Sequence, residues 1–296
     1  MVEEDMAEQG KRSSSSVRRV WTSVLGVVAG FLVMILLVAG GVKLFGGSGK
    51  AAAQEQQPSS SPSTSSAPVN IPVPVVSSAE LAALPRATTE GTVKAAPVNL
   101  TAGSGGNLVF ISKNITGFAA PGKNPITVIP YSQFAGRIWL PVIARMANWV
   151  QVRLPSRPNG STAWIPLTGL RTARTSWSVH VSLSSGTLEV SKGGVLMGEW
   201  TVGQGATSTP TPIGQTFLLA GFVDPDQDFS PIIYATGAHS NTLDSYGGGP
   251  GTVAIHGWPT EDGRRGKVSH GCVRVPAAAL AMFAELPAGT PIDITA

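Results

Sequence analysis

An uninterrupted apolar run lies near the N-terminus of the chain. Nineteen consecutive residues from Val24 to Val42 carry no charge, and as a helix they would span about 28 Å, close to the hydrocarbon thickness of a bilayer. Four basic residues precede the run and two follow it closely: Lys11, Arg12, Arg18, Arg19, Lys43 and Lys50. This imbalance predicts a cytoplasmic tail over 1–20, a single transmembrane anchor over 21–43 and an extracytoplasmic remainder.

A cleaved signal peptide is the alternative for the same run, with residues 51–53 (Ala-Ala-Ala) as the cleavage site. The run is longer than a usual signal-peptide apolar region, which favours the uncleaved anchor. Both interpretations export the rest of the chain. With the anchor retained, we expect the protein at the cell membrane with its folded part in the cell wall.

Residues 44–95 have a different composition, rich in Ser, Pro, Ala and Gly, with the densest Ser/Pro stretch between 58 and 68. Such a segment buries too little apolar surface to offset the entropy of ordering it. We therefore expect a disordered linker, stiffened locally by Pro72 and Pro74, that holds the folded part away from the membrane.

Short strands separated by turn residues follow over 96–172. Residues 149–154 alternate apolar and polar positions, 157–161 have the composition of a turn, and 163–167 resume a strand. The Trp-Val-x-Val, Asn-Gly and Trp-Ile sequence within 123–171 resembles the end of a bacterial Src-homology-3-like barrel. The resemblance implies a small β-barrel-like module that either binds the wall or packs on the next domain.

A second β-rich unit covers 176–296. The alternation over 179–183, a turn at 184–186 and an apolar stretch over 187–190 predict a hairpin. One helix is predicted over 276–286, because Pro276 suits a first helical position and Ala, Leu, Met and Phe follow it. The expected fold is therefore mostly β, with one late helix.

Composition excludes some functions and directs attention to a single thiol. Charged residues are 13% of the chain and the net charge is +4, without a basic face interleaved with aromatic residues, so we expect no nucleic-acid partner. The chain has one cysteine, Cys272, which cannot form an internal disulfide. Outside the membrane such a cysteine is buried and inert, bridged to another chain, or reactive.

The neighbours of Cys272 favour the reactive thiol. It lies in Ser-His-Gly-Cys-Val-Arg, residues 269–274, and a thiol needs a nearby base or cation to act as a nucleophile near neutral pH. Gly271 can take a positive φ, and a tight turn around a nucleophile can supply oxyanion-hole N–H groups. Either His270, on the same strand face, or His256, sixteen residues earlier, could be the base.

The pair His256-Gly257, followed by Ser-His-Gly-Cys-Val-Arg, resembles the active-site signature of the L,D-transpeptidase (YkuD-type) catalytic domain. Four further segments agree with that family, namely 209–214, 238–240, 247–251 and 286–294, although 214–217 carries one residue more than the family usually has. The resemblance covers 176–296. It implies a β-sandwich-like domain in which a cysteine–histidine pair acts on peptidoglycan stem peptides without a cofactor.

Carried over position by position, the resemblance makes Cys272 the nucleophile and His256 the general base. The carbonyl of Gly257 would orient that imidazole, and His270 and Gly271 would shape the oxyanion hole. For this chemistry, the sulfur of Cys272 is expected to be ionised beside an imidazole.

Four residues are expected to contact the substrate: Arg274, Ser269, His239 and Tyr246. Arg274 stands where family members carry Asn or Arg, and a guanidinium can hold a carboxylate by a forked pair of hydrogen bonds. His239 has an alternative interpretation as a loop histidine near the cleft. We expect no metal, because the cysteine and histidines lack the spacing of a zinc site.

The function that the resemblance implies is formation of 3→3 cross-links. A Cys272 thiolate attacks the L–D peptide bond of a donor tetrapeptide stem, D-alanine leaves, and an amine of a neighbouring stem takes the acyl group. Water as acceptor would make an L,D-carboxypeptidase, and a non-catalytic wall-binding scaffold is the alternative of another class. The resemblance also implies acylation by carbapenems. The sequence indicates no particular oligomeric state.

Overall fold

The computed structural model describes residues 69–246 and 249–296. The predicted cytoplasmic tail and transmembrane anchor, and residues 44–68 of the predicted linker, lie outside the described residues. Within these two ranges, no helix is long and apolar enough to cross a membrane.

The first sheet of the described chain has eight strands in the spatial order β3-β2-β7-β6-β5-β1-β8, with β4 paired to β5 outside this path. The strand pairs are antiparallel, as expected for neighbours joined by short turns. The predicted strands at 149–154 and 163–167 are β6 and β7. The strands are β1 (Asn107–Ile111), β2 (Ile115–Phe118), β3 (Pro125–Ile129), β4 (Ser132–Gln133), β5 (Gly136–Met146), β6 (Trp149–Arg153), β7 (Thr162–Pro166) and β8 (Arg171–Arg174).

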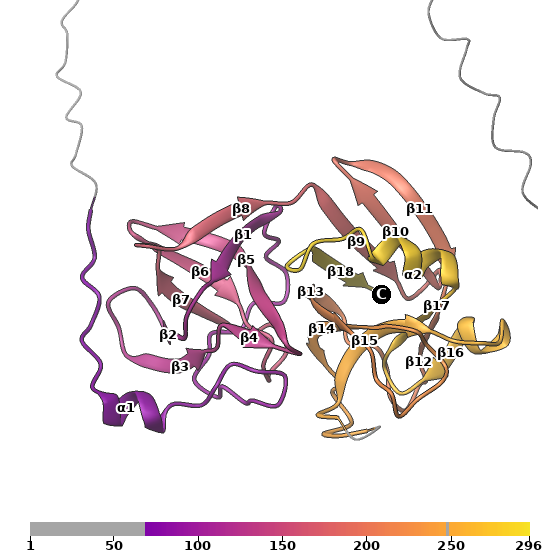
Figure 1. Ribbon diagram of the computed structural model, residues 1–296, viewed down its shortest axis with the longest axis horizontal. Coiled ribbons are helices and arrows are strands. Elements are labelled where there is room, and N and C mark those ends of the chain that lie inside the picture. The colour runs from indigo at the N-terminus through magenta and orange to yellow at the C-terminus, as the bar shows by residue number, and fades with distance from the viewer. Residues whose placement is uncertain (1–68, 247–248) are drawn as a thin grey trace, which may run out of the picture. The chain divides into compact units, whose positions relative to one another are not determined.

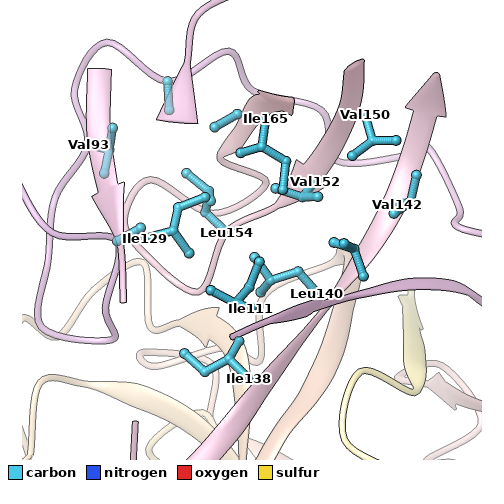
Figure 2. Close-up of a cluster of buried hydrophobic side chains, with 14 of the residues drawn as sticks. Val93, Ile111, Ile129, Ile138, Leu140, Val142, Val150, Val152, Leu154 and Ile165 are labelled. Atoms are coloured by element: carbon cyan, nitrogen blue, oxygen red, sulfur yellow. The ribbon is translucent and has the colours of Figure 1, made fainter. Parts of the chain in front are cut away.

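Fully buried aliphatic side chains form the core of this sheet (Figure 2). Ile111, Leu140 and Val152 come from β1, β5 and β6, where side chains alternate between the two faces of the sheet. Phe217 and Leu219 of the following unit belong to the same cluster. The first sheet and the chain that follows it therefore share apolar packing.

Residues 69–95 differ from the disordered linker that their composition predicts. They contain a short helix, α1 (Ser78–Ala83), which begins with a reciprocal capping box between Ser77 and Glu80. Ala87 and Val93 are fully buried in the core of the first sheet. A few well-placed apolar residues thus anchor a segment whose average composition is that of a linker, and the first module begins before residue 96.

The second sheet has ten strands among the described residues, in the order β11-β10-β9-β18-β13-β14-β15-β17-β12-β16 (Figure 1). The predicted hairpin is the antiparallel pair β9 and β10. The strands are β9 (Trp177–Ser182), β10 (Thr187–Lys192), β11 (Val195–Thr201), β12 (Gly203–Gly205), β13 (Gly214–Phe222), β14 (Ile233–His239), β15 (Thr252–Gly257), β16 (Gly266–Ser269), β17 (Val273–Val275) and β18 (Pro291–Thr295).

The predicted late helix is α2 (Ala277–Phe283), and Pro276 is its N-cap. Its buried face, with Leu280 and Phe283, packs in one cluster with Ile255 and Val275 of the sheet. The segment 214–217, which departs from the family pattern, pairs regularly as the first part of β13 with β18. The extra residue therefore leaves this strand intact.

Candidate active site

The sheet brings Cys272 and His256 to one face. Cys272 directly precedes β17, which runs parallel to β15 with His256 opposite Arg274 and Ile255 opposite Val273. Because side chains alternate along a strand, Ile255 and Val273 face the core under α2, whereas Cys272, Arg274 and His256 face the other side. Two motifs separated in the sequence thus meet on neighbouring strands.

A tight turn presents the nucleophile candidate. Gly271 has a φ of +120°, a conformation that favours glycine. The Ser269 hydroxyl donates to the Cys272 carbonyl at 2.6 Å and accepts from the Gly271 N–H at 3.1 Å. Ser269 is buried and holds this turn, so the structure does not place it where the expected substrate contact requires. The Gly271 N–H is engaged in the same turn, so in this conformation it is not free for the expected oxyanion hole.

The Thr-Pro-Thr-Pro segment braces this turn from a second side. Thr209 donates to the Ser269 carbonyl at 3.0 Å, and Thr211 donates to the Gly271 carbonyl at 2.9 Å. Thr211 also accepts from the Gly205 N–H at 2.9 Å. Sequence reasoning used the segment only as family resemblance. The sequence signal for its role was the alternation of two threonines with two prolines. The prolines keep the backbone extended, and residues two apart on an extended backbone direct their hydroxyls to one side.

The thiol of Cys272 is 5% exposed and lies against the hydroxyl of Tyr246. Burial raises the pKa of Cys272, while the Tyr246 hydrogen bond, the Ala254 N–H at 3.4 Å and the charge of Arg274 lower it less. The Tyr246 hydroxyl donates to the Thr252 carbonyl at 2.9 Å, which leaves its oxygen to accept from the S–H. The expected ionised sulfur is therefore not what this conformation holds, because a nearly sealed site disfavours the thiolate.

His256 has the orientation that the sequence predicts. Its Nδ1 lies 2.8 Å from the carbonyl oxygen of Gly257, so an Nδ1–H donated to that carbonyl leaves Nε2 free to accept a proton. The pKa of His256 is lowered to about 4, mainly by burial. The Gly257 hydrogen bond raises this pKa, and the charge of Arg274 lowers it further. The rings of Phe229 and Trp258 flank it. The imidazole is therefore neutral near pH 7, which is the state of a general base.

Arg274 lies over the ring of Trp258, a residue that the sequence analysis did not single out. Its guanidinium carbon is 3.4 Å from the ring centroid of Trp258, close to the contact distance of stacked planar groups. The buried Nε has no hydrogen-bond partner among the described residues. Trp258 directly follows His256-Gly257, and this position next to the motif was the sequence signal that could have placed it in the site. A guanidinium held by its face keeps its N–H edge for a carboxylate.

His270 and Tyr246 form an outer layer over the Cys272 thiol. His270 is exposed, and its ring stacks on Tyr246 with centroids 5.9 Å apart. Of the two histidines that local reasoning offered as the base, the structure buries His256 on the Cys272 face and leaves His270 in solvent. Tyr246, expected to contact substrate, contacts the thiol itself.

His239 occupies a different place from the expected substrate site. Its ring is fully buried at the end of β14, and Nε2 lies 2.6 Å from the carbonyl oxygen of Thr89. The pKa of His239 is lowered to about 4, mainly by burial, while the Thr89 hydrogen bond opposes this and the charge of Arg157 adds to it. A side chain enclosed by the preceding module cannot contact a substrate, so the expected substrate contact is wrong. The alternative, a loop histidine near the cleft, is also wrong, because His239 is a fully buried residue at the end of a strand.

Across residues 69–246 and 249–296, no three His, Cys, Asp or Glu side chains cluster in a way that could hold a metal ion.

Comparison with protein families gives a match over the second half of the chain. Residues 176–294 match the family model YkuD, described as the L,D-transpeptidase catalytic domain. No protein with a curated description matches the sequence.

Several solved structures resemble the chain. L,D-transpeptidase 3 from Mycobacterium tuberculosis, with a faropenem-derived adduct, is 15% identical with a TM-score of 0.37, covering 47% of this chain and 75% of that one. An L,D-transpeptidase from Mycobacterium smegmatis is 17% identical with a TM-score of 0.33, covering 50% and 91%. The catalytic domain of the E. faecium L,D-transpeptidase is 22% identical with a TM-score of 0.30, covering 40% and 95%.

Proposed function

We propose that the chain is a peptidoglycan L,D-transpeptidase with Cys272 as nucleophile and His256 as general base. The observation that carries the proposal is the placement of both side chains on one face of the β15–β17 pair, within the residues that match the L,D-transpeptidase catalytic domain. The neutral imidazole, held by the Gly257 carbonyl, supports the assignment of the base.

The acylation half-reaction begins with a thiol and a neutral imidazole. Nε2 of His256 takes the S–H proton while the sulfur of Cys272 bonds to the carbonyl carbon of the third residue of a donor stem. The tetrahedral intermediate then collapses, and the C–N bond to the terminal D-alanine breaks. The leaving amine receives the proton from His256. A thioester remains on Cys272.

The transfer half-reaction reverses these proton movements. An amine of a neighbouring stem loses a proton to His256 as its nitrogen bonds to the thioester carbonyl carbon. The carbon–sulfur bond breaks, and the sulfur regains a proton from His256. The product is a 3→3 cross-link, and the thiol is restored. Water in place of the amine gives a trimmed stem, the L,D-carboxypeptidase reaction.

Arg274 is the proposed carboxylate-binding residue. Its guanidinium is fixed on Trp258, and a planar fork of donors binds a carboxylate in a defined orientation. The donor stem ends in such a group. For the stem to reach the sulfur, the Tyr246 hydroxyl must leave Cys272, so donor binding and uncovering of the thiol are coupled.

The location of the enzyme belongs to the same proposal. The apolar run at 24–42 and the basic residues before it support a single-pass anchor with the catalytic part in the cell wall. The β1–β8 module is proposed as the Src-homology-3-like module that precedes the catalytic domain.

The test uses the full chain in detergent with a disaccharide-tetrapeptide, and mass spectrometry of the products. The proposal predicts free D-alanine and a cross-linked dimer, and neither with the matched Cys272→Ala variant. D-alanine without dimer would identify a carboxypeptidase. Absence of both products with the wild type would support the non-catalytic scaffold.

A further inference from the structure

Arg157 of the preceding β1–β8 module reaches into the catalytic domain and binds three of its carbonyl groups. The guanidinium donates to Ser240 at 2.9 Å and to Leu243 and Pro250 at 3.0 Å. In the sequence these carbonyls lie on both sides of Tyr246, whose hydroxyl contacts the Cys272 thiol. One side chain thus ties together the described parts of the segment that covers the nucleophile.

The backbone of Arg157 is fixed at its own end. Its N–H donates to the Gly91 carbonyl, and its carbonyl accepts from the Val93 N–H, both at 2.9 Å. Val93 is buried in the core of the first sheet. Residues of the predicted linker therefore fix the backbone of Arg157, so its guanidinium extends from a rigid part of the first module.

A second polar side chain reinforces the same junction two residues later. The Asn159 amide accepts from the His239 N–H at 2.8 Å and donates to the His239 carbonyl at 2.7 Å. It also donates to the Asn241 side chain at 2.9 Å. Such a reciprocal pair fixes position as a β-ladder does, and it fixes the point where the segment leaves β14.

The far end of the segment is shaped to fit Arg157. Gly251 has a φ of +69°, and a Cβ there would lie 2.8 Å from the Arg157 Nη2 and 2.5 Å from the Leu243 carbonyl oxygen. Only glycine lets the backbone close around the guanidinium at this distance.

We propose that Arg157 is a positioning residue that holds Tyr246 on the thiol of Cys272, so that the β1–β8 module controls access to the nucleophile. The importance of this control for cross-linking rests on the proposed function, whereas the control itself concerns the thiol alone. The first module is then a regulator of the catalytic cysteine and not only a spacer.

The single cysteine of the chain gives a direct measurement. The full chain in detergent is treated with 5,5′-dithiobis(2-nitrobenzoate), and the rate of thiol modification is compared between the wild type, Arg157→Ala and Tyr246→Ala. Both variants should react at least about tenfold faster. Arg157→Ala loses hydrogen bonds from a charged donor, and Tyr246→Ala removes the side chain that lies on the sulfur. Arg145→Ala, an exposed arginine of the same module, should react as the wild type.

The double variant separates positioning from a general loosening of the fold. If Arg157 acts through Tyr246, the Arg157→Ala/Tyr246→Ala chain reacts no faster than Tyr246→Ala alone. Effects that multiply, or a folded Arg157→Ala chain with the wild-type rate, would overturn the proposal. Should Arg157→Ala fail to fold, Arg157→Lys, which keeps the charge but loses the fork, is judged by the same two criteria. A wild-type chain that releases no D-alanine would instead refute the proposed function. The rates of thiol modification would still test the role of Arg157.

Discussion

The hydroxyl of Thr211 joins the Thr-Pro segment to the backbone of Gly271, sixty residues later, by a 2.9 Å hydrogen bond to the glycine carbonyl. The same oxygen accepts from the Gly205 N–H. One buried hydroxyl therefore connects β12, the Thr-Pro segment and the turn before Cys272.

Replacing this hydroxyl by a methyl group tests the brace. Thr211→Val keeps the shape but leaves the Gly205 N–H and the Gly271 carbonyl without their partner, at a cost of about 1–3 kcal/mol. We expect a lower free energy of unfolding in a denaturant titration and slower acylation of Cys272. Thr207→Val, at an exposed position of the same segment, is the matched control. Equal free energies of unfolding and equal acylation rates for the two variants would show that the Thr211 hydroxyl does not support the turn before Cys272.

The conformation of Gly271 gives a second prediction. A Cβ at this position has its nearest neighbours at 3.8 Å, so Gly271→Ala fits sterically, but φ of +120° costs an alanine about 1–3 kcal/mol of backbone strain. The turn should relax and move the sulfur. The acylation rate should therefore fall by a larger factor than the loss in free energy of unfolding alone would produce. Gly103→Ala, at an ordinary φ and with the nearest neighbour of its Cβ at 3.9 Å, controls for loss of a glycine. An acylation rate for Gly271→Ala equal to that of the control would contradict this.

The pKa of His256 sets the acid limit of the reaction. Because burial lowers that pKa to about 4, the imidazole remains a base throughout the range in which an ordinary histidine, with a pKa of about 6.5, becomes protonated. Carbapenem acylation measured against pH should therefore lose half its rate near pH 4. His256→Ala should be slower by about 10²- to 10⁴-fold. A midpoint near 6.5 in the wild type would show that His256 is not buried and neutral in the reacting state.

His239 links stability to pH in a way that can be isolated. Its folded-state pKa is lowered to about 4, so the unfolded chain binds more protons between about pH 6.5 and 4 and stability falls as the pH falls through that window. The loss assigned to this residue is on the order of 3 kcal/mol. In His239→Gln, whose amide can still donate to the Thr89 carbonyl, the dependence should flatten in urea titrations at several pH values. An unchanged slope would place the effect elsewhere.

The strands and the active-site motif could be predicted because their signals are local. Alternation of apolar positions marked the strands at 149–154 and 179–183, and the residues around Cys272 carried the resemblance to the family whose model matches 176–294. The position of His239 could not be predicted, since it depends on a carbonyl 150 residues away in a segment that composition assigned to a linker. The burial that raises the pKa of Cys272 likewise depends on the fold, which brings Tyr246 and other distant residues around the sulfur.

Intact-mass spectrometry of the full chain incubated with a carbapenem tests the central claim most directly, because the chain offers one thiol. The account predicts a single covalent adduct on the wild type, located on Cys272, and none on Cys272→Ala. A folded wild-type chain that forms no adduct, or an adduct that persists in Cys272→Ala, would contradict the assignment of Cys272 as an acyl-accepting nucleophile.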